Sequence, residues 1–244
     1  VLVHGFLASP AELRAYGESL AGFGYPVIGV RLRGHGTSPW DLRDRNWQEW
    51  LGSVRRGYEI ISAFAERVCV IGFSTGGALS LRLAAERPEN LAGVAAVSVP
   101  VKFRNTNLIC VPILHGINKL TQWLSSLEGL MPFRLNESEH PEINYRHIPV
   151  RGLFELRQLV DEMKQRLADV TCPVAIFQGT EDQIIDPKSA NSILDKISST
   201  DTSLHMIPSK RHGILSEDIG GTQELVTAFL MSLSSDEKDL VTTG

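Results

Sequence analysis

The sequence is poor in cysteine, the residue that most often marks a disulfide framework or a structural metal site. Its three cysteines, Cys69, Cys110 and Cys172, are an odd number and include no C-x-x-C pair. This spacing excludes a disulfide-stapled fold and a zinc-type motif. We therefore expect each cysteine to be a small buried apolar residue, and we expect no bound metal ion.

The chain also lacks an excess of one charge and a long hydrophobic run. It has 24 Lys and Arg against 28 Asp and Glu, a formal net charge of −4, which gives no electrostatic basis for binding nucleic acid or an anionic membrane surface. No apolar run approaches the ~20 residues that a helix needs to cross a bilayer. Internal repeats are absent, and only the polar tail from Ser234 to Gly244 is expected to fray. We therefore expect no nucleic-acid partner and no integral membrane segment.

The composition is otherwise that of a globular domain. Its 244 residues, 43% of them hydrophobic, suffice for one α/β domain with a full core. The chain opens at Val1–Phe6 in a pattern typical of the middle of a buried strand, so we expect further residues upstream. A signal peptide or membrane anchor in that upstream part stays open. For the chain itself we expect a cytoplasmic protein that is a monomer or a homodimer.

Short apolar, β-branched runs alternate with helical patterns along most of the chain. We expect strands at residues 1–3, 25–30, 67–71, 91–99, 173–178 and 202–207. Ser9 and Pro10 are expected to open the first helix, and Asn46 with Glu49 resembles a capping box that opens the next. This alternation predicts a three-layer α/β/α sandwich around a mostly parallel sheet, with the functional site at the carboxyl ends of the strands.

Residues 102–150 interrupt this alternation. They contain one apolar stripe at helical spacing, formed by Ile113, Ile117, Leu120, Leu124, Leu127 and Met131. An irregular, proline-bearing segment follows as far as Pro149. We interpret 102–150 as a small helical cap that turns an apolar face to the substrate; a helix packed into the core is the alternative. The single catalytic domain then consists of core residues 1–101, the cap 102–150 and core residues 151–244.

The pattern G-x-S-x-G at Gly72–Gly76 is the strongest functional signal in the chain. It follows the expected strand 67–71 and precedes good helix formers that end at Pro88. Strand, sharp turn and helix are the context in which this pattern forms a nucleophile elbow, because its small residues let strand and helix approach closely. We therefore predict that Ser74 is a nucleophile. A glycine-rich turn with an incidental serine is the alternative.

A nucleophilic serine needs a base to take its proton and a third group to orient that base. His212 lies just after the last expected strand, where such a base is needed, and Asp182 lies at the end of the preceding strand. Glu181, next to Asp182, is a competing acid. His140 and His147 lie in the predicted cap, lack convincing metal-ligand spacing and are expected to be solvated.

Two backbone N–H groups are expected to bind the oxyanion of the tetrahedral intermediate. One belongs to Thr75, the residue after the nucleophile, and the other to Phe6, in the loop after the first strand. His4 is expected to have a structural role rather than a catalytic one.

With these motifs assigned, the chain resembles the serine-hydrolase branch of the α/β-hydrolase superfamily and is similar to bacterial carboxylesterases and monoacylglycerol lipases. The matching segments are His4–Phe6, Arg33–Ser38, Gly72–Gly77, Gly179–Asp182 and His212. The order serine, acid, histidine is that of the superfamily. The resemblance implies the α/β-hydrolase fold with a small helical cap, hydrolysis of esters, and no cofactor.

The sequence departs from the family pattern in two respects. The first two strands of the family are absent from this chain, and Lys210 and Arg211 precede His212 where the family has a small residue. We expect both cations to point to solvent. The alternative is that they fold over the site, where they disfavour the imidazolium and help to hold an anionic product.

The sequence therefore predicts a serine carboxylic-ester hydrolase that forms an acyl-enzyme on short- to medium-chain acyl esters. Its expected partner is a small-molecule ester or monoacylglycerol, and the substrate-binding candidates are Leu7, Phe73, Ile113, Ile117 and Leu120. An acyltransferase, a thioesterase or a perhydrolase with the same triad stays open. An epoxide or haloalkane hydrolase is disfavoured because it carries a carboxylate where Ser74 stands. A non-catalytic hydrolase-fold binding protein is a remote alternative.

Overall fold

Parallel strands form the central sheet in the part of the chain that the computed structural model describes, residues 1–104, 133–136, 138 and 140–235. In this part the sheet has six strands in the order β2-β1-β3-β4-β7-β8. Their bounds are Leu2–Val3 (β1), Gly29–Val30 (β2), Val68–Phe73 (β3), Leu91–Val97 (β4), Val174–Gly179 (β7) and Thr202–Ile207 (β8). Each neighbouring pair is parallel, which confirms the predicted sheet.

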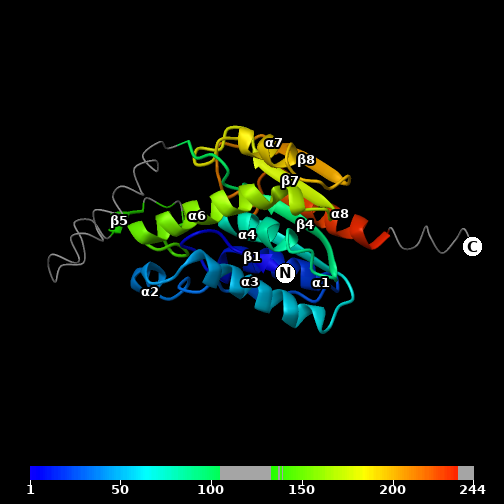
Figure 1. Ribbon diagram of the computed structural model, residues 1–244, viewed down its shortest axis with the longest axis horizontal. Helices are drawn as coiled ribbons and strands as arrows, with labels where there is room; N and C mark the ends of the chain where they lie inside the picture. The colour runs from blue at the N-terminus through cyan, green and yellow to red at the C-terminus, as the bar shows by residue number, and fades with distance from the viewer. Residues whose placement is uncertain (105–132, 137, 139, 236–244) are drawn as a thin grey trace, which may run out of the picture.

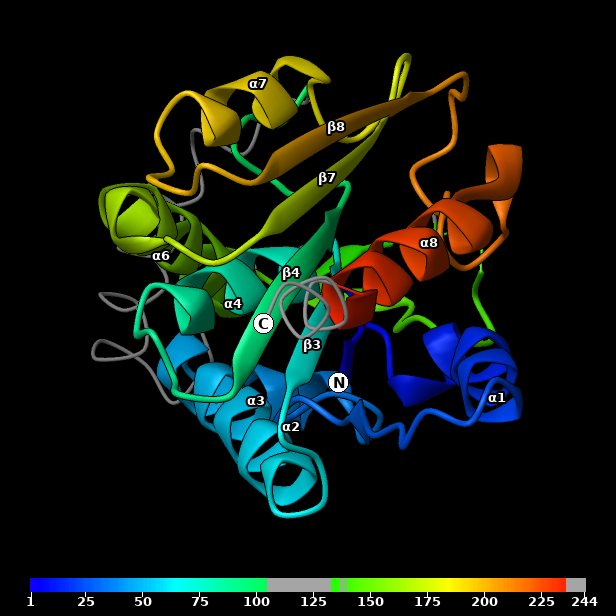
Figure 2. The same cartoon turned by 90° about the vertical axis from the view of Figure 1, so that its right-hand side faces the viewer.

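Helices cover both faces of this sheet (Figure 1 and Figure 2). One face carries α3 (Trp47–Ser62), α4 (Thr75–Ala84), α6 (Val150–Arg166) and α7 (Lys188–Leu194), whose apolar residues share one core cluster. The other face carries α1 (Arg14–Gly22) and α8 (Thr222–Ser235), which pack in a second cluster. Shorter elements are η1 (Pro10–Leu13), α2 (Pro39–Arg43), η3 (Leu167–Asp169) and η4 (Ile219–Gly221). No helix in the described ranges combines the length and apolar character needed to cross a membrane.

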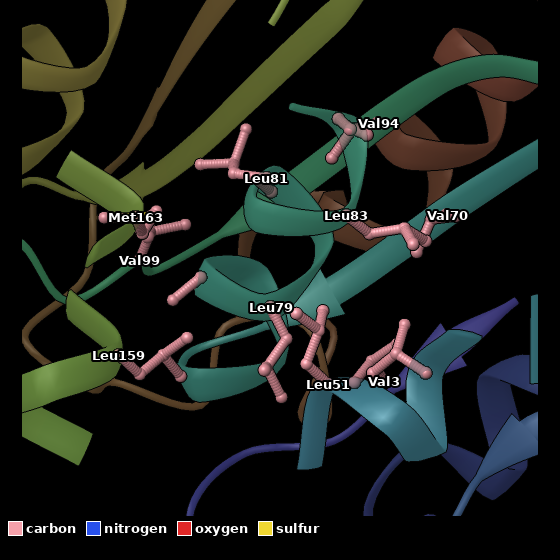
Figure 3. Packing of buried hydrophobic residues seen from close by; sticks show 14 of the residues in the cluster. Val3, Leu51, Val70, Leu79, Leu81, Leu83, Val94, Val99, Leu159 and Met163 are labelled. Carbon is pink, nitrogen blue, oxygen red and sulfur yellow. The ribbon is translucent and has the colours of Figure 1, made fainter. Parts of the chain in front are cut away.

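Helix α4 lies at the centre of the first core cluster (Figure 3). Its residues Leu79, Leu81 and Leu83 are buried, and their neighbours in the figure include Val70 of β3 and Val94 of β4. Burial of one such side chain contributes about 1.5–3 kcal/mol to the free energy of unfolding. This packing fixes the position of α4, and so of the residue immediately before it.

Local sequence signals set where the helices begin. Asn46 Oδ1 accepts a hydrogen bond from Glu49 N, and Glu49 Oε2 accepts one from Asn46 N, each at 3.0 Å, so the predicted capping box is confirmed. Ser9 Oγ accepts from Ala11 N at 3.3 Å, as predicted. The chain there first forms the 3-10 turn η1 and becomes α-helical only at Arg14.

The strand expected at residues 25–30 is shorter than predicted. Only Gly29 and Val30 belong to β2, because its partner β1 is itself two residues long. Ile28, just before β2, still bonds to the sheet, since its carbonyl accepts from Leu2 N at 2.8 Å. Pro26 has no N–H to donate to a ladder, which also disfavours a longer strand.

The predicted cap lies largely outside the described residues, which omit 105–132. The last part of the predicted cap, up to Pro149, was expected to be irregular, and this was wrong for its two ends, which form strands. Strand β5 (Phe133–Leu135) pairs antiparallel with β6 (His147–Pro149). Pro149 is tolerated because this ladder has two strands, so every strand in it is an edge. Figure 1 shows this hairpin beside α2 and α6.

Candidate active site

Ser74 occupies the sharp turn between β3 and α4. Its backbone has φ 54° and ψ −115°, a conformation that is strained for any residue other than glycine. A Cβ at Gly76 would lie 2.0 Å from the carbonyl oxygen of Val3, so only glycine allows α4 to approach β1 this closely. Strand, strained serine and helix follow one another as the sequence predicted for a nucleophile elbow.

His212 connects Ser74 to Asp182 in one hydrogen-bonded chain. Its Nε2 atom lies 3.0 Å from Ser74 Oγ, and its Nδ1 atom lies 2.7 Å from Asp182 Oδ2. A carboxylate only accepts hydrogen bonds, so Nδ1 carries the proton and Nε2 is free to accept from the serine hydroxyl. The three side chains that the sequence selected thus meet at the carboxyl ends of β3, β7 and β8.

Asp182 is fully buried, and its charge is supported by four hydrogen bonds. Burial opposes ionisation, but the hydrogen bond from His212 and those from the backbone N–H groups of Ile184 and Ile185 outweigh it and hold the pKa of Asp182 below its ordinary value. The two N–H groups donate to Oδ1 at 2.8 and 3.0 Å, and Gln178 Nε2 donates to Oδ2 at 3.2 Å. Asp182 therefore stays a carboxylate facing the imidazole.

The competing acid, Glu181, points elsewhere. Its side chain is exposed, and its Oε2 atom lies 3.8 Å from Lys210 Nζ. Adjacent carboxylates in the sequence thus have different surroundings, and Asp182 is the one that contacts His212.

The two N–H groups predicted to bind an oxyanion are those of Phe6 and Thr75. Thr75 is the first residue of α4, so its N–H has no acceptor within the helix. Among the described residues, neither N–H donates a hydrogen bond to a backbone carbonyl of the turns, loops or helix caps. Both groups lie in segments next to Ser74. Thr75 follows Ser74 directly in the sequence. Phe6 lies in the loop after β1, and β1 is the strand that contacts Gly76, two residues after Ser74.

His4 holds the loop that contains Phe6. Its Nδ1 atom lies 2.8 Å from the Gly5 carbonyl oxygen, and its Nε2 atom accepts from Leu32 N at 3.3 Å. Burial lowers the pKa of His4 to about 4, so the ring is neutral and Nδ1 is the donor. Because a peptide group is planar, fixing the Gly5 carbonyl also fixes the direction of the Phe6 N–H. The structural role predicted for His4 agrees with these contacts.

An aromatic layer lies beneath this loop. The rings of Phe6, His35 and Trp50 have centroids 5.5–5.8 Å apart, and the His4 ring lies 5.3 Å from that of His35 at an interplanar angle of 58°. Burial, followed by the neighbouring His4, lowers the pKa of His35. The R-G-H-G-T-S segment of the sequence therefore supports the loop after β1 by packing.

A known hydrolase family matches most of this chain. The family profile described as serine aminopeptidase, S33, matches residues 1–219. The chain belongs to this hydrolase family. A thermostable monoacylglycerol lipase of Bacillus sp. (strain H-257) is 31% identical over 216 residues, which cover 87% of this chain and 81% of that protein. A carboxylesterase of Bacillus subtilis (strain 168) is 24% identical over 215 residues, 88% of this chain and 84% of the relative.

Solved structures share the fold of this S33-family hydrolase. One, from work on the metagenome-derived lipolytic enzymes LipS and LipT, has a TM-score of 0.83 at 24% identity and covers 95% of this chain and 92% of its own. The monoacylglycerol lipase of Paleococcus ferrophilus has a TM-score of 0.73 at 21% identity, covering 95% and 93%. At the level of the family, the activity is that of a serine-type carboxylic ester hydrolase.

The segment before β6 contacts the loop that carries His212 in this hydrolase. His140 Nε2 lies 2.9 Å from Glu217 Oε1, and Arg211 Nε lies 2.8 Å from Glu217 Oε2. The hydrogen bond with Glu217 raises the pKa of His140. The expectation that His140 is simply solvated was therefore wrong, whereas His147 is exposed. Arg211 is partly exposed and held by Glu217.

The predicted substrate-binding residues divide into two groups. Leu7 and Phe73 are buried, and the Phe73 ring centroid lies 5.1 Å from that of His212. Leu7 has φ 68°, and its carbonyl accepts from Tyr145 N at 3.1 Å. Ile113, Ile117 and Leu120 lie outside the described residues.

Sequence reasoning missed two positioning side chains. Gln178 donates to Asp182, and Ser98 Oγ donates to the His212 carbonyl at 3.2 Å. Gln178 is the second-last residue of β7 and Ser98 directly follows β4, and this position near a strand end was the only sequence signal for either residue. In the described ranges, no group of three or more His, Cys, Asp or Glu is placed to hold a metal ion.

Proposed function

We propose that this protein hydrolyses carboxylic esters with Ser74 as the nucleophile, His212 as the general base and acid, and Asp182 as the group that orients and charges the imidazole. The observation that carries the proposal is the continuous chain from Asp182 Oδ2 through His212 to Ser74 Oγ, with separations of 2.7 and 3.0 Å. Hydrogen-bond reach between nucleophile, base and orienting group is the arrangement that activates a serine.

The reaction has two halves. Ser74 Oγ attacks the acyl carbon while His212 Nε2 takes its proton, and the oxyanion accepts hydrogen bonds from the N–H groups of Phe6 and Thr75. The imidazolium then protonates the leaving alcohol as the bond to the acyl carbon breaks. Water repeats the sequence on the acyl-enzyme, His212 again taking the proton, and releases the acid and free Ser74.

The magnitudes favour this assignment of roles. Loss of one oxyanion donor costs about 10²–10³ in rate, so two fixed N–H groups account for several kcal/mol of the barrier. Asp182 is buried and ionised, which stabilises the imidazolium at the moment it forms.

The substrate class follows from the relatives and from the predicted cap. Relatives named monoacylglycerol lipase and carboxylesterase support a small-molecule ester or monoacylglycerol as the substrate. The apolar stripe that includes Ile113, Ile117 and Leu120 supports a short- to medium-chain acyl group, with Leu7 and Phe73 on the core side of the pocket. We also propose that residues 102–150 form the cap and that the protein is cytoplasmic.

Hydrolysis of p-nitrophenyl esters from acetate to palmitate tests this function. We expect activity with an optimum at short to medium chains, and a loss of about 10⁴-fold or more in Ser74→Ala. Ser19→Ala, an exposed serine on α1, is the matched control and should keep full activity. Folded wild-type protein that cleaves no ester, or Ser74→Ala protein that cleaves as fast as wild type, contradicts the proposal. Product analysis with added glycerol separates a hydrolase, which releases free acid, from an acyltransferase, which forms a new ester.

A further inference from the structure

Glu12 lies beside the loop that carries Phe6, and the catalytic scheme gives it no role. It belongs to the 3-10 turn η1, which starts two residues after that loop ends at Ala8. Ser9 caps the turn, since its Oγ accepts from Ala11 N at 3.3 Å and its carbonyl accepts from Glu12 N at 3.0 Å. The turn brings the Glu12 side chain back onto the loop.

The Glu12 carboxyl group contacts Gly5 directly. Its Oε2 atom accepts a hydrogen bond of 2.7 Å from Gly5 N. A Cβ at Gly5 would lie 3.3 Å from the same oxygen and 3.3 Å from two ring carbons of Phe73. Gly5 is therefore confined between a carboxyl group and the aromatic ring that precedes the nucleophile.

This contact completes the support of the peptide that bears the Phe6 N–H. The Gly5 carbonyl is held by His4 Nδ1 at 2.8 Å, and the Gly5 N–H is held by Glu12. Both peptide groups that flank the Gly5 α-carbon are thus fixed. The Gly5 carbonyl and the Phe6 N–H share one planar peptide group, and the Gly5 α-carbon joins it to the peptide group that Glu12 holds, so a shift at either contact changes the direction of the Phe6 N–H.

The charged groups that face Glu12 belong to the same site. Burial raises the pKa of Glu12 to about 7, while the Gly5 N–H and then the nearby His212 and His140 act in the opposite direction. His140 in turn faces Glu217 and Glu142. A carboxyl oxygen can accept from Gly5 N in either protonation state, so the contact with the loop persists through the titration.

We propose that Glu12 is a positioning residue for the oxyanion site: it holds the Gly5 amide and so keeps the Phe6 N–H directed at the place where the oxyanion forms. The inference rests on the proposed function and extends it to a side chain that does not touch the substrate. A misplacement of about 1 Å in a catalytic group lowers the rate by up to about 10²-fold, so loss of the Glu12 contact should lower kcat.

Two substitutions separate the contact from the charge. Glu12→Ala removes the acceptor, and we expect kcat for p-nitrophenyl butyrate to fall about 10- to 100-fold with KM changed less than about threefold. Glu12→Gln keeps an acceptor oxygen without the charge and should stay within about threefold of wild type. Glu18→Ala, an exposed acid on α1, is the matched control and should leave kcat unchanged.

Affinity for a trifluoromethyl ketone adds a readout that loss of stability alone does not move. This probe forms an oxyanion on Ser74, so its affinity should fall in Glu12→Ala by about the same factor as kcat/KM. If Glu12→Ala does not fold, Glu12→Asp replaces it as the test. Its side chain is shorter by one methylene, so the carboxyl group lies farther from Gly5 N, and kcat should fall while the melting temperature stays near that of wild type. Full activity in a folded Glu12→Ala or Glu12→Asp variant, or a Glu12→Gln variant as slow as Glu12→Ala, overturns the proposal.

The Ser74→Ala variant keeps this test distinct from that of the proposed function. If Ser74→Ala abolishes ester cleavage and the folded Glu12 variants match wild type, only the role of Glu12 fails. If Ser74→Ala retains wild-type activity, the proposed function fails, and the role of Glu12 fails with it.

Discussion

His212 Nε2 lies 3.0 Å from Ser74 Oγ, although 138 positions separate the two residues in the sequence. Both are anchored at the same strand end. Ser74 N donates to the Val97 carbonyl at 2.8 Å, and Ser98 Oγ donates to the His212 carbonyl at 3.2 Å. Consecutive residues at the end of β4 therefore set the separation between the proposed nucleophile and its base.

Ser98→Ala should weaken this anchor without unfolding the protein. Ser98 is fully buried, and one hydrogen bond contributes about 1 kcal/mol, so we expect kcat to fall about 3- to 10-fold with KM little changed. Steady-state kinetics on a p-nitrophenyl ester, with Ser192→Ala as the control, measure this. An unchanged kcat would show that the His212 loop holds its position without Ser98.

Asp182→Asn should lower kcat/KM by about 10³–10⁴-fold, because the imidazole loses both its correct tautomer and the charge that stabilises the imidazolium. The neighbouring Glu181→Gln is a close control, since that side chain is exposed and contacts Lys210 instead. Comparable losses in the two variants would contradict the assignment of Asp182.

Gly76→Ala should destabilise the protein strongly, because the new Cβ would lie 2.0 Å from the Val3 carbonyl oxygen, and neither backbone can move away. We expect a loss of at least about 3 kcal/mol, or a melting temperature about 10 °C lower. Gly22→Ala, in a helix with no atom within 4 Å of the new Cβ, should instead stabilise by about 0.5–1 kcal/mol. Equal melting temperatures would refute the close approach of α4 and β1.

His4 should make the protein less stable in acid. Its pKa is about 4 in the folded state and near 6.5 when unfolded, so between these values the unfolded chain binds the additional proton. Stability should therefore fall as the pH drops from 6.5 to 4, by up to about 3 kcal/mol from this residue.

Urea unfolding across this pH range measures the effect. Relative to wild type, His4→Gln should lose less stability as the pH drops from 6.5 to 4. The buried His35 contributes in the same direction as His4, whereas Glu12, whose pKa burial raises to about 7, contributes in the opposite direction, so the comparison between the two proteins carries the test. The exposed His147→Gln should leave the decline unchanged. A His4→Gln variant with the wild-type slope would contradict the neutral buried imidazole.

The parts of the fold with local signals were predictable from the sequence. The capping box of Asn46 and Glu49 and the turn at Ser74 depend on residues only a few positions apart. Each can therefore be recognised within a short stretch of sequence. Strand β2 and the β5–β6 hairpin depend on partners far along the chain. Leu135 meets His147 only through tertiary folding, and the prolines at 132, 141 and 149 concealed the pairing.

The same distinction applies to the site. The hydrogen-bonded group of Ser74, His212 and Asp182 was predictable because each of these side chain types has an expected place after a strand. Gln178 and Ser98 are polar strand-end residues like many others, and their contacts appear only when the strands are adjacent. Glu12 resembled an ordinary acid in the first turn of a helix, where such residues are common. Nothing local indicated its bond to Gly5.

Covalent labelling of Ser74 tests the central claim most directly. The protein is treated with a fluorophosphonate, which reacts with activated serines, and the adduct is located by mass spectrometry of the peptides. We predict one adduct per chain, on Ser74, with none in Ser74→Ala and markedly slower formation in His212→Ala. A folded protein that cleaves esters but carries the adduct on another residue, or none, would contradict the account.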